Sequence, residues 1–590
     1  MSVQSPPVVA RAGQRPAVPG RARHTAAAAT VWYLRLLAAL NVAAVVAAPF
    51  RREVREHNTG ELFTPYLATA GLVTAVLASF LAVVMRRRKR AAWILNLALA
   101  TPLLALYTAA MTQEAYRRHA FNWFSTVLTA LFVAALLLGR GEFRARGPRS
   151  NTQRGLAALA VAAVACGAAG TALVTATNRL GGASLDDRVA YSLLRVVTLG
   201  PGADGLDAIA VPRWVDVLIN ILAALSLLAV LYVCFRAPRG KELLTAADEE
   251  RLRALLERHG ARDSLGYFAL RRDKAVVFSP SGKAAIAYRV VGGVTLASGD
   301  PIGDTEAWPG AIAAWLGQAR EHAWVPAVIG ASEAAGVVYA RHGLDALELG
   351  DEAIVDRRDF TLEGRTMRPV RQACRRVQRA GYTVRIRHHE DIPEAEMADL
   401  VERADRWRAT DTERGFSMAL GRLGDPGDGR CVMVECHDAH GELRALLSFV
   451  PWGGEGLSLD LMRRDRACDN GLVEFMVAEL LQRSHLLGVE RLSLNFAMFR
   501  SVFERGARLG AGPFLRLWRS ALTFFSRWWQ IESLYRANAK YRPGWEPRFL
   551  LFENSGELPR IGLVCARAEG FVAAPRLGSL FRRRHWPPGS

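Results

Sequence analysis

The stretch from Val211 to Phe235 reads VPRWVDVLINILAALSLLAVLYVCF and is apolar over almost its whole length. A helix of ~20 apolar residues is long enough to cross the hydrocarbon core of a bilayer. Similar runs precede it, and basic connections separate several of them. They cover about Val31–Pro49, Phe63–Met85, Ala91–Met111, Phe121–Gly139 and Gly155–Ala176. The sequence therefore predicts a transmembrane domain of six helices over residues 31–236.

The basic residues between these runs predict an orientation. Short cytoplasmic connections of membrane proteins are enriched in Lys and Arg. The tail of residues 1–30 and the connections Arg86–Arg90 and Arg140–Arg154 are strongly basic, whereas the intervening connections are nearly neutral or slightly acidic. We therefore expect both ends of the membrane domain in the cytoplasm, in a plasma-membrane protein. The basic tail shows no clear cleavage site, so we expect no removed signal peptide.

The charge is distributed unevenly along the chain. Residues 1–240 hold 26 basic and 10 acidic side chains, which is +16 of the total net charge of +20. Residues 241–490 are acidic on balance, with 33 basic and 40 acidic side chains. The last hundred residues hold 17 basic against 6 acidic side chains and many aromatic ones. Such a block suits an anionic lipid surface or RNA phosphates.

The remainder of the chain alternates strand-like and helical patterns, which predicts an α/β domain with hairpins and two similar halves. A charged helical linker over residues 237–262 precedes it. The tempting metal cluster is Cys431, Cys436, His437 and His440. Its first part alternates like a strand and lacks the tight cysteine spacing of zinc sites, so we predict no metal. We also find no coenzyme A loop and predict no cofactor.

Several separated blocks then resemble one family. They are Ser298–Gly303, Gly350–Asp356, Arg379–Val384, Leu459–Arg463, Leu492–Ala497 and Ser533–Arg548. Together they are similar to the phosphatidylglycerol lysyltransferase (multiple peptide resistance factor) family in its actinobacterial form. The resemblance implies two tandem acyltransferase folds of the GNAT type, over residues 263–388 and 389–575, followed by a basic tail over 576–590. It also implies transfer of an amino acid from aminoacyl-tRNA to a lipid hydroxyl.

The resemblance assigns roles to particular positions. Asp460, Arg463 and Lys540 match family positions as catalytic candidates, and Arg548 matches one as a substrate-binding candidate. Tyr535 and Asn495 lie within the matching blocks and Trp528 within an aromatic helical segment, and we add these three as substrate-binding candidates. Lys540 also stands out because no other lysine follows Lys283. In an arginine-rich chain, a retained lysine suits a site that needs a compact ammonium.

These residue types fit aminoacyl transfer. The ester of aminoacyl-tRNA is already activated, so positioning and charge stabilisation matter more than a strong nucleophile. Asp460 can hold the amino acid's ammonium or accept the proton of the lipid hydroxyl. Lys540 can stabilise the oxyanion or the leaving ribose oxygen. Simpler readings stay open: Asp460 can form a structural pair with Arg463, and Arg548 can be a surface charge.

The segment Phe514–Tyr541 carries Phe, Leu and Trp at helical spacing with interspersed arginines. Such a pattern predicts an amphipathic helix at a membrane surface or an ordinary core helix. The transmembrane runs upstream favour the membrane surface.

The expected activity is transfer of an amino acid, lysine first, to phosphatidylglycerol, which weakens binding of cationic peptides. The expected partners are aminoacyl-tRNA, in particular lysyl-tRNA made elsewhere, and phosphatidylglycerol; a homo-oligomer stays open. The rivals are a Fem-type transferase that acts on a peptidoglycan precursor, and a lipid flippase or scaffold without catalysis.

Overall fold

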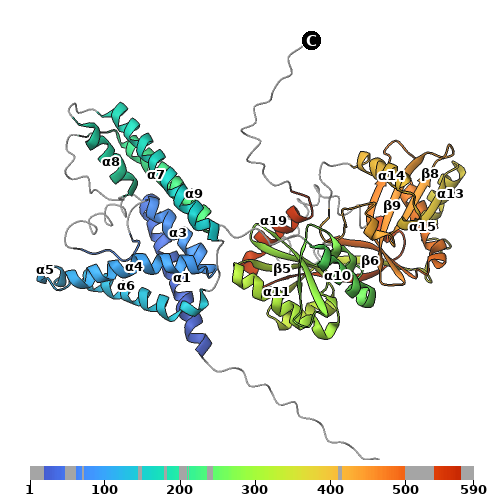
Figure 1. The fold of residues 1–590 in the computed structure, drawn as a ribbon, viewed down its shortest axis with the longest axis horizontal. Helices are drawn as coiled ribbons and strands as arrows, with labels where there is room; N and C mark the ends of the chain where they lie inside the picture. The colour runs from blue at the N-terminus through green and yellow to red at the C-terminus, as the bar shows by residue number, and fades with distance from the viewer. Residues whose placement is uncertain are drawn as a thin grey trace, which may run out of the picture. The chain divides into compact units, whose positions relative to one another are not determined.

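The structure is a computed structural model. It describes residues 19–46, 62–68, 72–143, 149–178, 183–197, 209, 211–235, 244–408, 415–498 and 537–572. The chain divides into an amino-terminal helical unit and a carboxyl-terminal unit built around a sheet (Figure 1). Trp528, Tyr535 and most of the predicted amphipathic helix lie outside the described residues, as do the basic tail over 576–590 and the start of the amino-terminal tail.

The amino-terminal unit consists of helices. They are α1 (Pro19–Val46), α3 (Leu72–Arg86), α4 (Arg90–Ala110), α5 (Glu114–Arg117), α6 (Ala120–Leu138), α7 (Arg149–Thr177), α8 (Leu185–Val197) and α9 (Arg213–Phe235), with the short turn η1 (Arg140–Glu142). Among the described residues, 5 helices are long and apolar enough to cross a membrane. The run expected at Phe63–Met85 forms only the 15-residue helix α3, so the predicted number of six spans is not confirmed.

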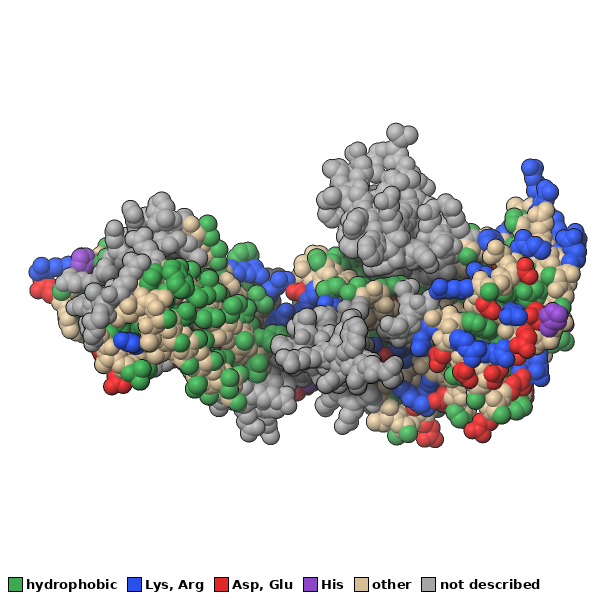
Figure 2. Space-filling view, turned by 90° about the horizontal axis from the view of Figure 1, so that it is seen from above, with side chains coloured by type: hydrophobic (Ala, Val, Ile, Leu, Met, Phe, Trp, Pro, Cys, Tyr) green, Lys and Arg blue, Asp and Glu red, His purple; other side chains and the backbone are tan. Residues whose placement is uncertain are grey.

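The two units differ in their surfaces. Apolar side chains cover much of the amino-terminal unit, whereas Lys, Arg, Asp and Glu are spread over the carboxyl-terminal unit (Figure 2). Trp32, Leu106 and Val164 are among the large apolar side chains that the helices expose. Exposed apolar surface of this extent marks a membrane or interaction surface. It fits helices that face lipid.

Polar side chains instead lie inside the helical unit. Asn96 and Asn122 are fully buried. The Oδ1 atom of Asn122 accepts a hydrogen bond from the backbone N–H of Phe63 at 2.6 Å, and the hydroxyl of Tyr66 lies 3.3 Å from Oδ1 of Asn96. Without water in a bilayer core, such groups need protein partners. These contacts tie the segment 62–68 to α4 and α6.

Helix α8 lies in a connection for which the sequence suggested no helix. Ser184 and Asp187 cap its start reciprocally: the backbone N–H of Asp187 donates to the Ser184 hydroxyl at 3.1 Å, and the backbone N–H of Ser184 donates to the Asp187 carboxylate at 3.0 Å. This arrangement satisfies donors that a helix start leaves without partners. The hydrogen bonds to Ser184 lower the pKa of Asp187.

The carboxyl-terminal unit is a mixed sheet with helices packed on it. Its strands are β1 (Ala275–Phe278), β2 (Ala284–Val291), β3 (Val294–Ser298), β4 (Ile302–Gly303), β5 (Val325–Ala331), β6 (Asp345–Asp356), β7 (Thr383–His388), β8 (Val432–His437), β9 (Leu443–Trp452), β10 (Gly456–Arg464), β11 (Arg491–Met498) and β12 (Gly544–Phe552). Its helices are α10 (Ala246–His259), α11 (Trp308–His322), α12 (Glu333–Arg341), α13 (Arg368–Arg379), α14 (Glu394–Arg406), α15 (Leu472–Arg483) and α19 (Leu558–Ala568). The predicted α/β architecture is confirmed.

Strands from distant parts of the chain meet in the middle of the sheet. The order is β1-β2-β3-β5-β12-β6-β11-β10-β9-β8-β7, and β4 pairs with β2. β12, near the carboxyl end, lies between β5 and β6 and is antiparallel to both. β6 in turn pairs with β11. The centre of the sheet therefore combines strands from both expected subdomains, whose boundaries stay a prediction.

Two apolar cores stabilise this sheet. One surrounds β2, β3 and β5 together with α10 and α19, and includes Phe268, Leu296 and Ile561. The other lies among β8, β9, β11, α13 and α15, and includes Phe449 and Phe475. Burying such side chains contributes ~1.5–3 kcal/mol each. The second core holds α15 beside β8 and β9, next to the place where β10 and β11 part.

Candidate functional site

Strands β10 and β11 run parallel but pair over only three residues. Ser458 and Ser493 form the last pair, although both strands continue. Beyond it, β10 has a bulge between Leu459 and Leu461, and β11 has an irregularity after Ser493. Bulges bend strands and redirect side chains. The two strands thus separate within the sheet.

A cavity of about 290 Å³ lies at this separation. It is lined by Leu447, Leu459, Met462, Arg464, Asn470, Gly471, Leu472, Val473, Glu474, Val477, Leu494, Ala537, Asn538 and Tyr541. The walls are mainly apolar, with a few polar groups. This composition is typical of small-molecule sites.

Asparagine side chains bind backbone carbonyls at this separation: Asn495 joins β11 to β10, and Asn538 binds β11 from outside the two strands. Nδ2 of Asn495 donates to the Leu459 carbonyl at 2.6 Å, and Nδ2 of Asn538 donates to the Leu494 carbonyl at 3.1 Å. Asn495 has a φ of 66°, in the left-handed region that asparagine tolerates better than most residues. Its buried Oδ1 accepts no hydrogen bond from the described residues. The substrate-binding role of Asn495 stays a prediction.

Lys540 forms an ion pair with Glu474, which lines the same cavity. Its Nζ is 2.7 Å from Oε1 of Glu474, in the first turn of α15. The Lys540 side chain is 41% exposed and the Glu474 side chain 21%. Burial raises the pKa of Glu474, but the hydrogen bond from Lys540, a backbone hydrogen bond and the charges of Lys540 and Arg464 together outweigh it, so the pKa is lowered. Glu474 is therefore ionised and holds the ammonium of Lys540.

Asp460 lies at the bulge of β10. Its Oδ1 accepts a hydrogen bond from the backbone N–H of Leu420 at 2.6 Å. The loop that carries Leu420 is itself fixed from two sides. Nη1 of Arg271 donates to the carbonyls of Gly415 at 2.5 Å and Ala419 at 3.0 Å. The backbone of this loop therefore holds the carboxylate in place.

Buried Glu569, at the end of α19, supplies the second anchor. Its carboxylate accepts hydrogen bonds from the N–H of Phe416 at 2.7 Å and from the N–H and hydroxyl of Ser417 at 3.1 and 2.6 Å. A carboxylate that accepts several N–H and O–H bonds makes strong, charge-assisted contacts. Glu569 was not a sequence candidate, because nothing in its local pattern marks a link to residues 150 positions away in the chain.

Arg463 follows Asp460 on β10 and is half-buried. Its Nη1 donates to the neighbouring Met462 carbonyl at 3.0 Å. Its catalytic role stays a prediction, as do the roles of Asp460 and Lys540.

Arg548 lies in a different environment. The residue is 3% exposed, so the reading of it as a surface charge is wrong. Its Nε atom donates to Glu352 at 2.8 Å. Its Nη1 atom donates to Asp263 at 2.9 Å and to the Gly330 carbonyl at 3.3 Å. Its Nη2 atom donates to Ser264 at 2.8 Å and to Glu352. These contacts occupy all five of its N–H donors. They favour a structural role, and the substrate-binding role of Arg548 stays a prediction.

The network around Arg548 extends to the strand separation. The Ser493 hydroxyl donates to Glu352, and the Ser458 hydroxyl donates to the Ser264 carbonyl at 2.7 Å. Ser458 and Ser493 are the last paired residues of β10 and β11. Hydrogen bonds thus connect the buried Arg548–Glu352 ion pair to the residues at which β10 and β11 separate. Glu352 was not a sequence candidate, although like Asp460 it is a carboxylate beside apolar residues in a strand, a local signal that could have pointed to it.

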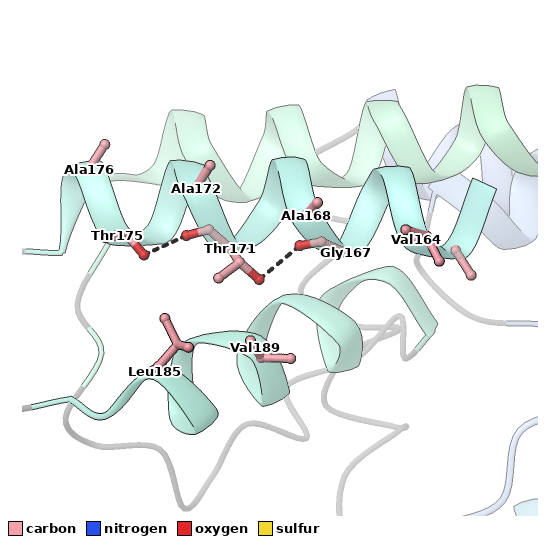
Figure 3. A pocket seen from close by; sticks show the side chains of 10 residues that line it. Val164, Gly167, Ala168, Thr171, Ala172, Thr175, Ala176, Leu185 and Val189 are labelled. Atoms are coloured by element: carbon pink, nitrogen blue, oxygen red, sulfur yellow. Dashed lines mark hydrogen bonds between the residues drawn. The ribbon is translucent and has the colours of Figure 1, made fainter. Parts of the chain in front are cut away.

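A second cavity, of about 800 Å³, lies between α7 and α8 in the helical unit (Figure 3). Gly167, Ala168 and Ala172 are among the small residues that line it. The hydroxyls of Thr171 and Thr175 point back to carbonyls of their own helix at 2.8 Å (Figure 3). These hydroxyls are already hydrogen-bonded, so the cavity lacks the chemistry expected of a transfer site.

Comparison with known proteins follows this geometry. Residues 253–552, which include β10, β11, α15 and Lys540, match the family described as "Phosphatidylglycerol lysyltransferase, C-terminal". The chain belongs to this phosphatidylglycerol lysyltransferase family. Residues 22–235 match a second description, "Transmembrane region of lysyl-tRNA synthetase". The helical unit is accordingly a multi-pass transmembrane region, with the family's carboxyl-terminal domain after it.

Individual relatives agree with the family assignment. The chain is 50% identical over 510 residues to the "Lysylphosphatidylglycerol biosynthesis bifunctional protein LysX" of Rhodococcus jostii, covering 86% of this chain and 45% of that protein. It is 45% identical over 574 residues to the protein of the same description from Mycolicibacterium vanbaalenii, covering 95% and 50%. The chain thus spans about half the length of these relatives. The solved structure of L-PGS from Bacillus licheniformis is similar in fold, with a TM-score of 0.50 at 23% identity over 57% of this chain and 99% of that chain.

Proposed function

We propose that the chain is a membrane-bound aminoacyltransferase that moves an amino acid, lysine, from aminoacyl-tRNA to the glycerol hydroxyl of phosphatidylglycerol. The observation that carries the proposal is the family match of residues 253–552, because this range contains the cavity lined by Glu474 and Asn538. Asn495 and Lys540 lie beside that cavity. The catalytic unit works on the cytoplasmic side, where aminoacyl-tRNA is made, and the basic connections of the membrane region support that orientation. Self-association stays a prediction.

In the proposed reaction, the lipid hydroxyl oxygen attacks the carbonyl carbon of the aminoacyl ester. A new ester bond forms, the bond to the ribose oxygen breaks, and the hydroxyl proton ends on that leaving oxygen. Asp460, held by the Leu420 N–H, accepts the proton or holds the α-ammonium of the amino acid. The ammonium of Lys540 stabilises the negative charge that develops during transfer.

The arrangement of the site favours this chemistry over a site for a strong nucleophile. Burial raises the pKa of the Cys431 thiol well above its ordinary value, so this cysteine near Asp460 stays protonated. The polar groups that line the cavity include the Glu474 carboxylate, the Arg464 guanidinium and the amides of Asn470 and Asn538, and the Lys540 ammonium lies on Glu474. Such groups position and stabilise charge in the transfer of an activated ester.

Lipid labelling tests the function directly. Cells that express the full chain are fed labelled lysine, and their lipids are extracted and identified by mass spectrometry. We expect labelled phosphatidylglycerol with the wild-type chain and none with Asp460→Ala or Lys540→Ala. Glu402→Gln, in an exposed pair with Arg406, serves as the control and retains labelling. Label in muropeptides instead of lipid would identify a Fem-type transferase.

A further inference from the structure

The cavity between β10 and β11 combines apolar walls with one carboxylate. Leu447, Val477, Leu494 and Tyr541 are almost fully buried and form much of the lining. Glu474 is the acidic residue among the described lining residues. A mainly apolar cavity with a carboxylate suits a ligand that has an aliphatic chain ending in a cation.

Glu474 already pairs with one such cation, which is not itself a lining residue of the cavity. Lys540 is a four-carbon aliphatic chain with a terminal ammonium, and its Nζ lies 2.7 Å from Glu474. A lysyl group on tRNA carries the same side chain. We propose that Glu474 binds the side-chain ammonium of the transferred amino acid, and that Lys540 occupies this carboxylate when no substrate is bound. The inference rests on the proposed function and specifies how its site selects the amino acid.

The energetics allow such an exchange. A partly exposed ion pair contributes ~0–1 kcal/mol, so the Lys540–Glu474 contact is broken at little cost. The ammonium of an incoming lysyl group then replaces Lys540 as the partner of the Glu474 carboxylate. Because Glu474 is ionised, it discriminates against a neutral side chain, which offers the carboxylate no partner.

The exchange also couples selection to chemistry. Once displaced from Glu474, the ammonium of Lys540 becomes available to the ester carbonyl, where negative charge develops. A neutral amino acid leaves Lys540 bound to Glu474 and the oxyanion without its cation. Arg464 lines the same cavity and is exposed, so its guanidinium can pair with a phosphate of the incoming tRNA.

Binding of small esters tests the proposal without tRNA or lipid. The full chain in detergent is titrated with lysine methyl ester and with norleucine methyl ester, which has a similar shape and lacks the ammonium. We expect the wild type to prefer the lysine ester by roughly tenfold. Glu474→Gln removes that preference and leaves norleucine binding unchanged. Glu479→Gln, on the same helix and paired with Arg483, is the control and keeps it.

Lys540→Met gives the sharper test. Removing the internal competitor tightens binding of the lysine ester by about threefold, in line with a weak exposed pair, and leaves the norleucine ester unaffected. If Glu474 merely positions Lys540, this variant binds the lysine ester no better than the wild type. Equal binding of both esters by the wild type, binding of neither, or a preference that survives Glu474→Gln overturns the proposal. Absence of lipid labelling with intact ester preference instead overturns the proposed function alone.

Discussion

Arg548 and Lys540 are cations eight positions apart in one motif, and their environments are opposite. Arg548 is 3% exposed and makes ion pairs with Asp263 and Glu352, whereas the Lys540 side chain is 41% exposed and pairs with Glu474. A planar guanidinium fits a fixed set of buried acceptors, and a flexible ammonium fits a position that must change partners. The comparison favours a structural role for Arg548 and is consistent with the predicted catalytic role of Lys540.

Removing Arg548 is expected to have the largest effect. Arg548→Met leaves Asp263 and Glu352 buried without their cation, which costs ~3–5 kcal/mol of unfolding free energy. The nearby carboxylates hold the pKa of Arg548 above its usual range despite the burial. Thermal unfolding of the purified chain measures the loss. Arg548→Lys keeps the charge but not the fork of donors, so we expect partial loss. A stable Arg548→Met chain that lacks only activity would reverse the comparison.

Changing Lys540 is expected to reduce activity and to leave stability nearly unchanged. Lys540→Met loses an exposed ion pair worth ~0–1 kcal/mol, while transfer falls by roughly 10²–10³-fold because a charge-stabilising group is gone. Lys540→Arg keeps a cation near Glu474 but not a compact ammonium, so transfer stays low. Single-turnover transfer rates and unfolding midpoints, measured on the same preparations, separate the two effects. Full activity of Lys540→Arg would show that any cation suffices.

The sequence indicated much of this architecture and less of the site. Long apolar runs and alternating α/β patterns are local signals, so the membrane unit and the sheet domain could be predicted. The placement of β12 between β5 and β6 depends on pairing between residues about 200 positions apart, for which no local pattern exists. The contact of Glu569 with the loop that holds Asp460 is equally non-local. A carboxylate in an apolar strand needs a partner, and this local signal applies to Asp460 and to Glu352, although only Asp460 was among the candidates.

The network around Arg548 also predicts a dependence of stability on pH. Burial, and then the charge of Asp263, raise the pKa of Asp300 to about 7, although Arg548 opposes them. An acid with a raised pKa in the folded state contributes stability that is present below its unfolded pKa, ~4, and is lost as pH rises through about 7. Unfolding midpoints of the wild type should therefore fall between pH 5 and pH 8 relative to Asp300→Asn. Parallel curves for the two chains would contradict this.

The smallest effect is expected at the loop that holds Asp460. Ser417→Ala removes one hydroxyl bond to Glu569 and keeps both backbone N–H bonds, so it costs ~0.5–1.5 kcal/mol of stability. Because the loop places the Leu420 N–H on Asp460, a looser anchor lowers kcat more than it raises KM. Ser417→Thr keeps the hydroxyl and should restore kcat. A change confined to KM would place the loop in substrate binding instead. In that case the substrate would help to set the position of Asp460, as we propose for Lys540. A loss confined to kcat would instead show that the fold fixes Asp460 before the substrate binds, as it fixes Arg548.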